Sequence, residues 1–133
     1  MSAYIVQAYA SGIANGLPNV IWFSVAGWRG SALLDAWLNT LPAYTTFQFA
    51  SACLSNAIFV KPITEFPGIK GFEFTRDGHR MWVLWSITTT DNPHIITPGT
   101  EPVSQAFDMY GGSLGSGISL SIGLEPVYVE FSS

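Results

Sequence analysis

Charged residues are scarce in this sequence. They make up 11% of its 133 residues, whereas globular domains average about 25%. The five positive charges are spread singly along the chain, as Arg29, Lys61, Lys70, Arg76 and Arg80. Nucleic-acid-binding modules carry a basic stripe, so we expect no nucleic-acid partner and no attraction to an anionic membrane. At 48% hydrophobic residues, the chain is either very well buried or has apolar surface meant for a partner.

Cysteine is almost absent, because Cys53 is the only one. This excludes an internal disulfide and a zinc cluster built from neighbouring thiols. The residues around Cys53 are mainly apolar, so we expect a buried, unreactive thiol. We expect no cofactor and no metal.

A long uninterrupted apolar run is also absent, although no charged residue precedes Arg29. A signal peptide needs a positive start and a compact apolar segment, and a spanning helix needs about 20 mainly apolar residues. Polar residues, glycine or proline interrupt both uncharged stretches, 1–28 and 43–60. The sequence therefore predicts a soluble chain with no signal peptide and no membrane partner.

The first third of the chain has the pattern of helices around one buried strand. Ser2 to Asn15 shows helical spacing of apolar residues, and Gly16 and Pro18 end it. Val20 to Val25 has almost no polar alternation, which is typical of strands covered on both faces in parallel α/β sheets. Two further helices are expected, a short one from Ser31 to Leu38 and another from Pro42 to about Leu54.

After Asn56 the apolar period changes from helical to two. Asp77-Gly78 predicts a hairpin turn, and the strand after it, 81–85, is apolar on both faces and therefore central. The glycine-rich stretch 111–117 reads as a long hairpin turn, and Ile118–Ile122 with Val127–Phe131 as a last hairpin. Further strands are expected at 58–60, 72–75, 94–96 and 103–108.

These patterns predict an α+β fold in two parts. The first part, 1–56, contains the helices and the one buried strand, a partial β/α-barrel remnant. The second part, 57–133, contains short strands separated by Gly, Pro and Asn turns, which indicate an antiparallel β-sandwich. We expect the sheet to pack against the helical part.

The acidic residues are not placed for catalysis. Hydrolysis of a glycosidic bond needs two carboxylates about 5 to 9.5 Å apart. Glu73 and Glu130 alternate with apolar neighbours and are expected to face solvent. Asp77 and Asp91 occupy turn contexts, and Asp35 and Asp108 are expected to satisfy local backbone groups. His79 and His94 lack the setting of a nucleophile or its base, so the sequence predicts no catalytic residue.

Aromatic residues are plentiful, with five Trp, five Tyr and nine Phe. Trp22 lies near the end of the predicted buried strand, and Trp28 and Arg29 follow in the next loop. Ligands bind at that end of the strands in parallel α/β architectures, and indole rings stack on the apolar faces of sugars. Trp22, Trp28 and Arg29 are therefore candidate substrate-binding residues, although core packing explains Trp22 equally well. Trp82 and Trp85, on opposite faces of one strand, are expected in the core or an interface.

Several motifs occur in a specific order along the chain. They are VIWFSVAGWRGSALLD (20–35), PAY (42–44), GFEF (71–74), MWVLWS (81–86), FDMYG (107–111) and PVYVEF (126–131). This order resembles the C-terminal portion of (β/α)8-barrel glycoside hydrolases. In those enzymes the last barrel strand often ends in Trp, a helix closes the barrel, and a small β-sandwich follows.

The resemblance implies a role for each element. Ser2 to Asn15 would match the seventh barrel helix, Val20 to Val25 the eighth strand and Ala43 to Leu54 the eighth helix. In this family the acid/base carboxylate follows strand four and the nucleophile ends strand seven, both of which would lie before Met1. Of the active-site positions, only Trp22 would therefore carry over, as a wall of the sugar pocket. The resemblance therefore implies the non-catalytic C-terminal region of a glycoside hydrolase, inactive alone, whose β-sandwich buttresses the barrel.

Two alternatives stay open from the sequence. The first alternative is a stand-alone carbohydrate-binding module, and the second is a structural domain that self-associates. Without neighbours, the strand Val20 to Val25 would have unpaired edges, and such edges template pairing between chains. We therefore expect a homo-oligomer, or contact with a catalytic barrel that this chain lacks.

Overall fold

The computed structural model describes residues 2–17, 32–88, 94–99, 103–117 and 119–132. In these residues the two helices are α1 (Ser2–Ala14) and α2 (Pro42–Leu54). The strands are β1 (Ile58–Ile63), β2 (Ile69–Arg76), β3 (His79–Ser86), β4 (His94–Ile96), β5 (Val103–Phe107), β6 (Ser113–Gly117), β7 (Leu120–Ile122) and β8 (Val127–Phe131).

Both long helices form where the sequence predicts them. Gly16 ends α1 with a φ of 76°, a conformation that glycine adopts without a steric penalty. Its N–H donates to Ile13 O and the next N–H, that of Leu17, to Gly12 O, each at 3.0 Å. These two bonds satisfy carbonyls that a helix end leaves unpaired. At the start of α2, Pro42 stands in the first turn, where its missing N–H costs nothing.

The predicted short helix from Ser31 to Leu38 is wrong for its described residues. They form a loop closed by a bridge between Leu34 and Thr40. Within it, Asp35 Oδ1 accepts hydrogen bonds from the N–H groups of Trp37 at 2.8 Å and Asn39 at 2.9 Å. An aspartate that binds nearby N–H groups in this way competes with helix formation. The expectation that Asp35 serves local backbone is thereby confirmed.

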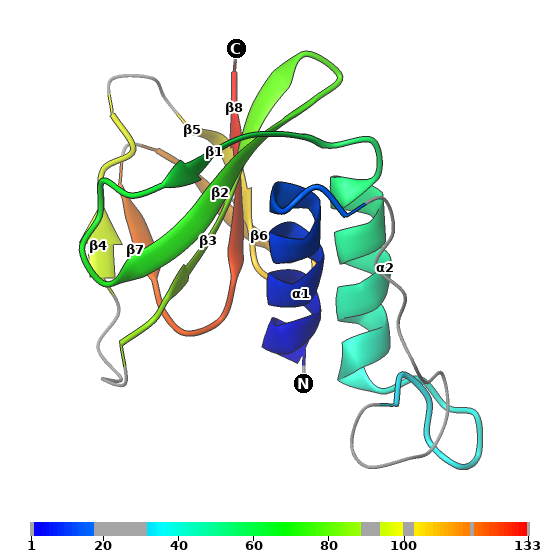
Figure 1. Ribbon diagram of the computed structural model, residues 1–133. Coiled ribbons are helices and arrows are strands. Elements are labelled where there is room, and N and C mark those ends of the chain that lie inside the picture. Colours follow the sequence, from blue (N-terminus) through cyan, green and yellow to red (C-terminus); the bar gives the residue numbers. More distant parts are fainter. Residues whose placement is uncertain (1, 18–31, 89–93, 100–102, 118, 133) are drawn as a thin grey trace.

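The strands form two antiparallel sheets, which confirms the α+β prediction. Six strands are ordered β1-β2-β3-β8-β5-β6, and β4 pairs with β7 in a second sheet. Figure 1 shows α1 and α2 on one side of the large sheet and β4 and β7 on the other. As predicted, β3 is an interior strand, between β2 and β8.

The predicted last hairpin, Ile118–Ile122 with Val127–Phe131, is wrong. β7 pairs with β4, where His94 lies opposite Ile122, while β8 pairs with β3 and β5. β8 buries Val127, Tyr128 and Val129 in succession, so it is covered on both faces. Such a strand lies inside a sheet and takes neighbours from distant parts of the sequence.

The glycine-rich stretch 111–117 is only partly a turn. The turn is limited to residues 108–112, where Asp108 Oδ1 accepts from the N–H groups of Tyr110 at 2.9 Å and Gly112 at 2.8 Å. Residues Ser113–Gly117 form the exposed edge strand β6, paired with β5. The local backbone role expected for Asp108 is confirmed.

Two apolar clusters fill the two faces of the large sheet. The helix-side cluster joins α1 and α2 to the sheet, with Val6, Cys53, Phe74 and Trp85 among its buried residues. The strand-side cluster lies between the large sheet and the β4–β7 pair, and its buried residues are Ile63, Ile69, Trp82, Leu84, Ile96, Val103, Ala106, Ile122, Val127, Val129 and Phe131. Trp82 and Trp85 are therefore core residues on opposite faces, as predicted.

The helix-side cluster contains residues from both predicted parts of the chain, 1–56 and 57–133. The predicted buried strand, Val20–Val25, lies outside the described residues, so the barrel remnant stays a prediction. No helix among the described residues is long and apolar enough to cross a membrane.

Candidate functional site

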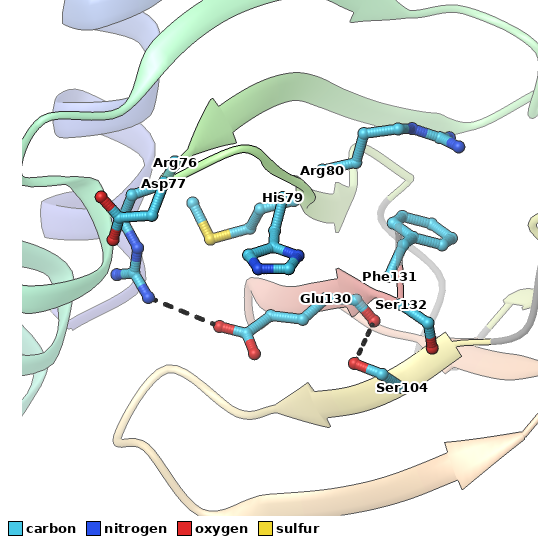
Figure 2. Close-up of a pocket in the computed structure, with 9 residues that line it drawn as sticks. Arg76, Asp77, His79, Arg80, Ser104, Glu130, Phe131 and Ser132 are labelled. Carbon is cyan, nitrogen blue, oxygen red and sulfur yellow. Dashed lines mark hydrogen bonds and ion pairs between the residues drawn. The ribbon is translucent and has the colours of Figure 1, made fainter.

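The residues that the sequence singled out for substrate binding, Trp22, Trp28 and Arg29, lie outside the described residues. Their role stays a prediction. The described residues instead bring a set of polar side chains together at the end of the large sheet (Figure 2).

A cavity of about 270 Å³ opens there, beside the turn between β2 and β3. We call it the hairpin-end cavity, and its lining residues are Arg76, Asp77, His79, Arg80, Met81, Ser104, Glu130, Phe131 and Ser132. Asp77 and Gly78 have φ angles of 53° and 82°, as a tight two-residue hairpin turn requires. That turn sets Arg76 opposite His79, and pairing with β8 sets Met81 opposite Glu130.

Arg76 connects the cavity to α2. Its Nη1 donates to Ala52 O at 2.8 Å and to Cys53 O at 2.9 Å, carbonyls in the last turn of the helix. Its Nη2 lies 3.7 Å from Glu130 Oε1 on β8, as Figure 2 shows. A cation at a helix C-terminus is favourable because the carbonyl end of the helix is partly negative. Arg76 therefore fixes α2 against the sheet.

Arg80 lies at the other side of the cavity and is bound from two directions. Its Nη2 is 3.6 Å from Glu73 Oε2, and its guanidinium carbon is 4.7 Å from the centre of the Phe131 ring. The same Glu73 oxygen accepts a 2.7 Å hydrogen bond from Trp82 Nε1. Glu73 is buried, so the expectation that it faces solvent is wrong. Its carboxylate lies inside the fold because Trp82, directly opposite on β3, donates a hydrogen bond to it.

Glu130 is also less exposed than expected. Its side chain retains 33% of its accessible area, because Arg76 and the neighbouring strands cover the rest. Its backbone carbonyl accepts a 3.2 Å hydrogen bond from Ser104 Oγ. As expected for turn and surface residues, Asp77 and His79 are exposed.

A second cleft shares Arg76, Asp77 and Glu130 with the hairpin-end cavity. Its lining residues are Phe49, Ala52, Cys53, Ser55, Asn56, Arg76, Asp77, Phe107 and Glu130. Burial raises the pKa of the Cys53 thiol to about 11, so near neutral pH it stays protonated and is a poor nucleophile. The predicted burial of the thiol is confirmed, and its lack of reactivity stays a prediction.

Tyr128 lies in the helix-side cluster beside this cleft. Its ring meets Phe49 edge-on, with ring centres 4.9 Å apart. Burial raises the pKa of its phenol, and within the described part of the chain the hydroxyl has no hydrogen-bond partner. The phenol is held neutral, so it contributes shape rather than charge.

The chemistry available in the hairpin-end cavity is recognition of polar groups. Among the carboxylates near it, Glu130 pairs with Arg76 and Glu73 with Arg80. Asp77 lies in the turn between β2 and β3 and is exposed. The described residues contain no cluster of three or more metal-ligating side chains.

Only part of this cavity could be predicted from the sequence. Asp77-Gly78 predicts the turn and hence the neighbourhood of Arg76 and His79. No local pattern predicts that β8 lies beside β3. The presence of Glu130, Phe131 and Ser132 in the cavity therefore could not be predicted from the sequence.

Comparison with known proteins gives one fold relationship. No protein-family model matches the sequence, and no curated protein matches it. Among solved structures, the chain is similar to a family 39 glycoside hydrolase from the gut symbiont Bacteroides cellulosilyticus WH2, with a TM-score of 0.74 and 19% identity. The similarity covers 98% of this chain and 30% of that enzyme, so this chain spans less than a third of its length.

Proposed function

We propose that the chain is a non-catalytic C-terminal region of a glycoside hydrolase. In this proposal residues 57–133 form a β-sandwich that buttresses a catalytic (β/α)8 barrel. α1, the segment Val20–Val25 and α2 then supply the last barrel elements. The motif order in the sequence and the fold shared with 30% of a family 39 glycoside hydrolase support this assignment.

The observation that carries the proposal is the chemistry of the helical layer. Neither α1 nor α2 contains a charged residue. Helices that border solvent usually place charged or polar residues on the outer face, and here the exposed polar residues of α2, which include Gln48 and Ser51, are all uncharged. Among the described residues, Tyr4 retains 62% and Trp37 85% of its accessible area. Two uncharged helices, an exposed tyrosine on α1 and an exposed tryptophan in the loop before α2 fit a surface that other polypeptide covers.

The covering polypeptide is the catalytic barrel or, where the barrel is absent, a second copy of this chain. In the second case the chain forms a homo-oligomer through α1, α2 and the loop that carries Trp37. The charge distribution favours this face over the sheet, because Arg29 and Asp35 are the only charged residues among the first 56.

A stand-alone carbohydrate-binding module is the second candidate. In its usual form it predicts an exposed aromatic platform on the β-part of the chain. In the described residues beyond position 56, the exposed large aromatic side chain is Tyr110, at 38%. A flat platform is therefore poorly supported there, and Trp37 belongs to the helical part. A self-associating structural domain predicts the same oligomer as above but no parent enzyme.

Amide hydrogen exchange on the isolated chain tests the proposal that other polypeptide normally covers α1 and α2. In the monomeric chain we expect the amides of α1 and α2 to exchange much faster than those of β3 and β8, because the helices then lack their outer cover. Tyr4→Lys should shift any oligomer towards monomer, measured by light scattering. Ile95→Lys is the matched control, since Ile95 is 69% exposed on β4. Helices as protected as β3 in a monomer would contradict the proposal.

Activity assays test the non-catalytic assignment. We expect no turnover of nitrophenyl glycosides of the common hexoses and pentoses by the purified chain. A measurable rate that Glu130→Gln or Asp77→Asn abolishes would overturn this assignment, because those two carboxylates line the hairpin-end cavity.

A further inference from the structure

The hairpin-end cavity has a balanced charge. Two guanidinium groups, those of Arg76 and Arg80, line it together with two carboxylates, those of Asp77 and Glu130. A third carboxylate, Glu73, lies 3.6 Å from Arg80. An anion in this cavity would face carboxylates and a cation would face guanidiniums, and like charges brought together are costly. The charge pattern therefore favours a neutral ligand.

The polar lining offers donors and acceptors at close quarters. Guanidinium groups only donate, carboxylates only accept, and the hydroxyls of Ser104 and Ser132 can do both. A molecule with several adjacent hydroxyls also donates and accepts at each of them. Such a molecule can add hydrogen bonds to the carboxylate oxygens and serine hydroxyls of this lining while the ion pairs Arg76–Glu130 and Arg80–Glu73 stay in place.

The volume of the cavity and its apolar lining residues restrict the class of ligand further. The cavity holds about 270 Å³, just below the range of about 300–1,000 Å³ for drug-sized ligands. Met81 and Phe131 line it and are both buried, so part of its wall is apolar. A single sugar ring combines apolar C–H faces with a rim of hydroxyls and suits both parts of the lining.

We propose that the hairpin-end cavity binds one neutral sugar unit, free or as the end of a glycan chain. The site lies on strands and a turn of residues 76–132, and none of its lining residues belongs to the segment Val20–Val25. The choice of a sugar over other neutral polyols rests on the proposed function. The cavity itself, its charge balance and its lining do not depend on it.

The two histidines provide a test with an internal control. His79 lines the cavity, whereas His94 is on β4, where its Nε2 lies 3.1 Å from Thr88 Oγ1. Proton NMR at fixed pH should show the ring protons of His79 shifting saturably on addition of glucose, galactose, xylose or their methyl glycosides, at millimolar concentrations. The ring protons of His94 should stay in place.

Two variants connect the shift to the cavity. Ser132→Trp places a bulky side chain in the cavity without removing an ion pair and should abolish the shift. Ser121→Trp, at an exposed position on β7, is the matched control and should leave it unchanged. Circular dichroism checks that both variants fold; if Ser132→Trp does not, Ser104→Leu replaces it.

Other outcomes overturn the proposal. A His79 shift with inorganic phosphate but with none of the sugars would make the cavity an anion site. No shift with any probe, or equal shifts of His79 and His94, would mean that it binds no sugar. Hydrogen exchange on the helices is independent of these results, so failure here is distinguishable from failure of the proposed function.

Discussion

The indole Nε1 of Trp82 donates a 2.7 Å hydrogen bond to Glu73 Oε2 within the fold. The two residues lie directly opposite each other on β3 and β2. Arg80 Nη2, 3.6 Å from the same oxygen, supplies the opposite charge. A buried carboxylate needs such partners, because an unpaired charge in the interior costs several kcal/mol.

We expect Glu73→Ala to lower the free energy of unfolding by about 2–4 kcal/mol. The substitution leaves the Trp82 N–H without an acceptor and removes the partner of Arg80. Urea denaturation monitored by tryptophan fluorescence measures the change. Glu65→Ala is the control: Glu65 forms an exposed 3.7 Å pair with Lys61, so its loss should cost less than about 1 kcal/mol. Equal effects of the two substitutions would contradict this role of Glu73.

The burial of Glu73 shows what local patterns in the sequence miss. Alternation along β2 predicts that Glu73 points away from its apolar neighbours, which is correct. Alternation does not say that the β4–β7 sheet covers that second face, because β7 and β4 meet only through tertiary structure. The helix ends, by contrast, are encoded locally at Gly16 and Pro42, and the sequence predicts both.

The same distinction explains the candidate site. Asp77-Gly78 encodes its turn, so Arg76 and His79 could be placed together from the sequence. Glu130 and Ser104 reach the cavity because β8 lies between β3 and β5, a non-local arrangement. The prediction of a helix around Asp35 was wrong for a local reason. Aspartate and asparagine favour turns, and both residue types are present in this segment of the sequence.

Arg76 should stabilise the packing of α2 on the sheet. Arg76→Ala removes the hydrogen bonds to Ala52 O and Cys53 O and leaves Glu130 without its cation. We expect a loss of about 1–3 kcal/mol in the free energy of unfolding. Arg76→Lys keeps the charge but cannot present the planar fork, so it should recover only part of the loss. Full recovery by lysine would mean that charge alone matters.

Gly71 is required by close packing between β2 and β3. A Cβ at this position would collide with the side chain of Leu84 and lie 2.7 Å from Val83 O, and a strand backbone cannot easily move away. We expect Gly71→Ala to cost about 1–3 kcal/mol, the usual penalty for overpacking a core. At Gly123 a Cβ would meet nothing within 4 Å, so Gly123→Ala should change the unfolding free energy by less than about 0.5 kcal/mol. Thermal denaturation of the two variants gives the comparison.

The last prediction concerns the pH dependence of stability through Cys53. Burial raises the pKa of this thiol to about 11 in the folded chain, whereas an unfolded cysteine titrates near about 8.5. The folded state therefore holds the proton more tightly. This contribution to stability is fully present below the unfolded pKa and is lost as the pH rises towards the folded pKa.

Stability should consequently fall between about pH 8.5 and pH 11 more steeply in the native chain than in Cys53→Ala, which lacks the titrating group. Tyrosines and lysines also titrate in this range, so only the difference between the two slopes reports on Cys53. Denaturant unfolding at a series of pH values measures those slopes. In the folded chain at pH 8, a thiol reagent should modify Cys53 far more slowly than in denaturant, because the thiolate is the nucleophile. Parallel slopes together with rapid modification would show that the thiol is accessible and titrates like a free cysteine.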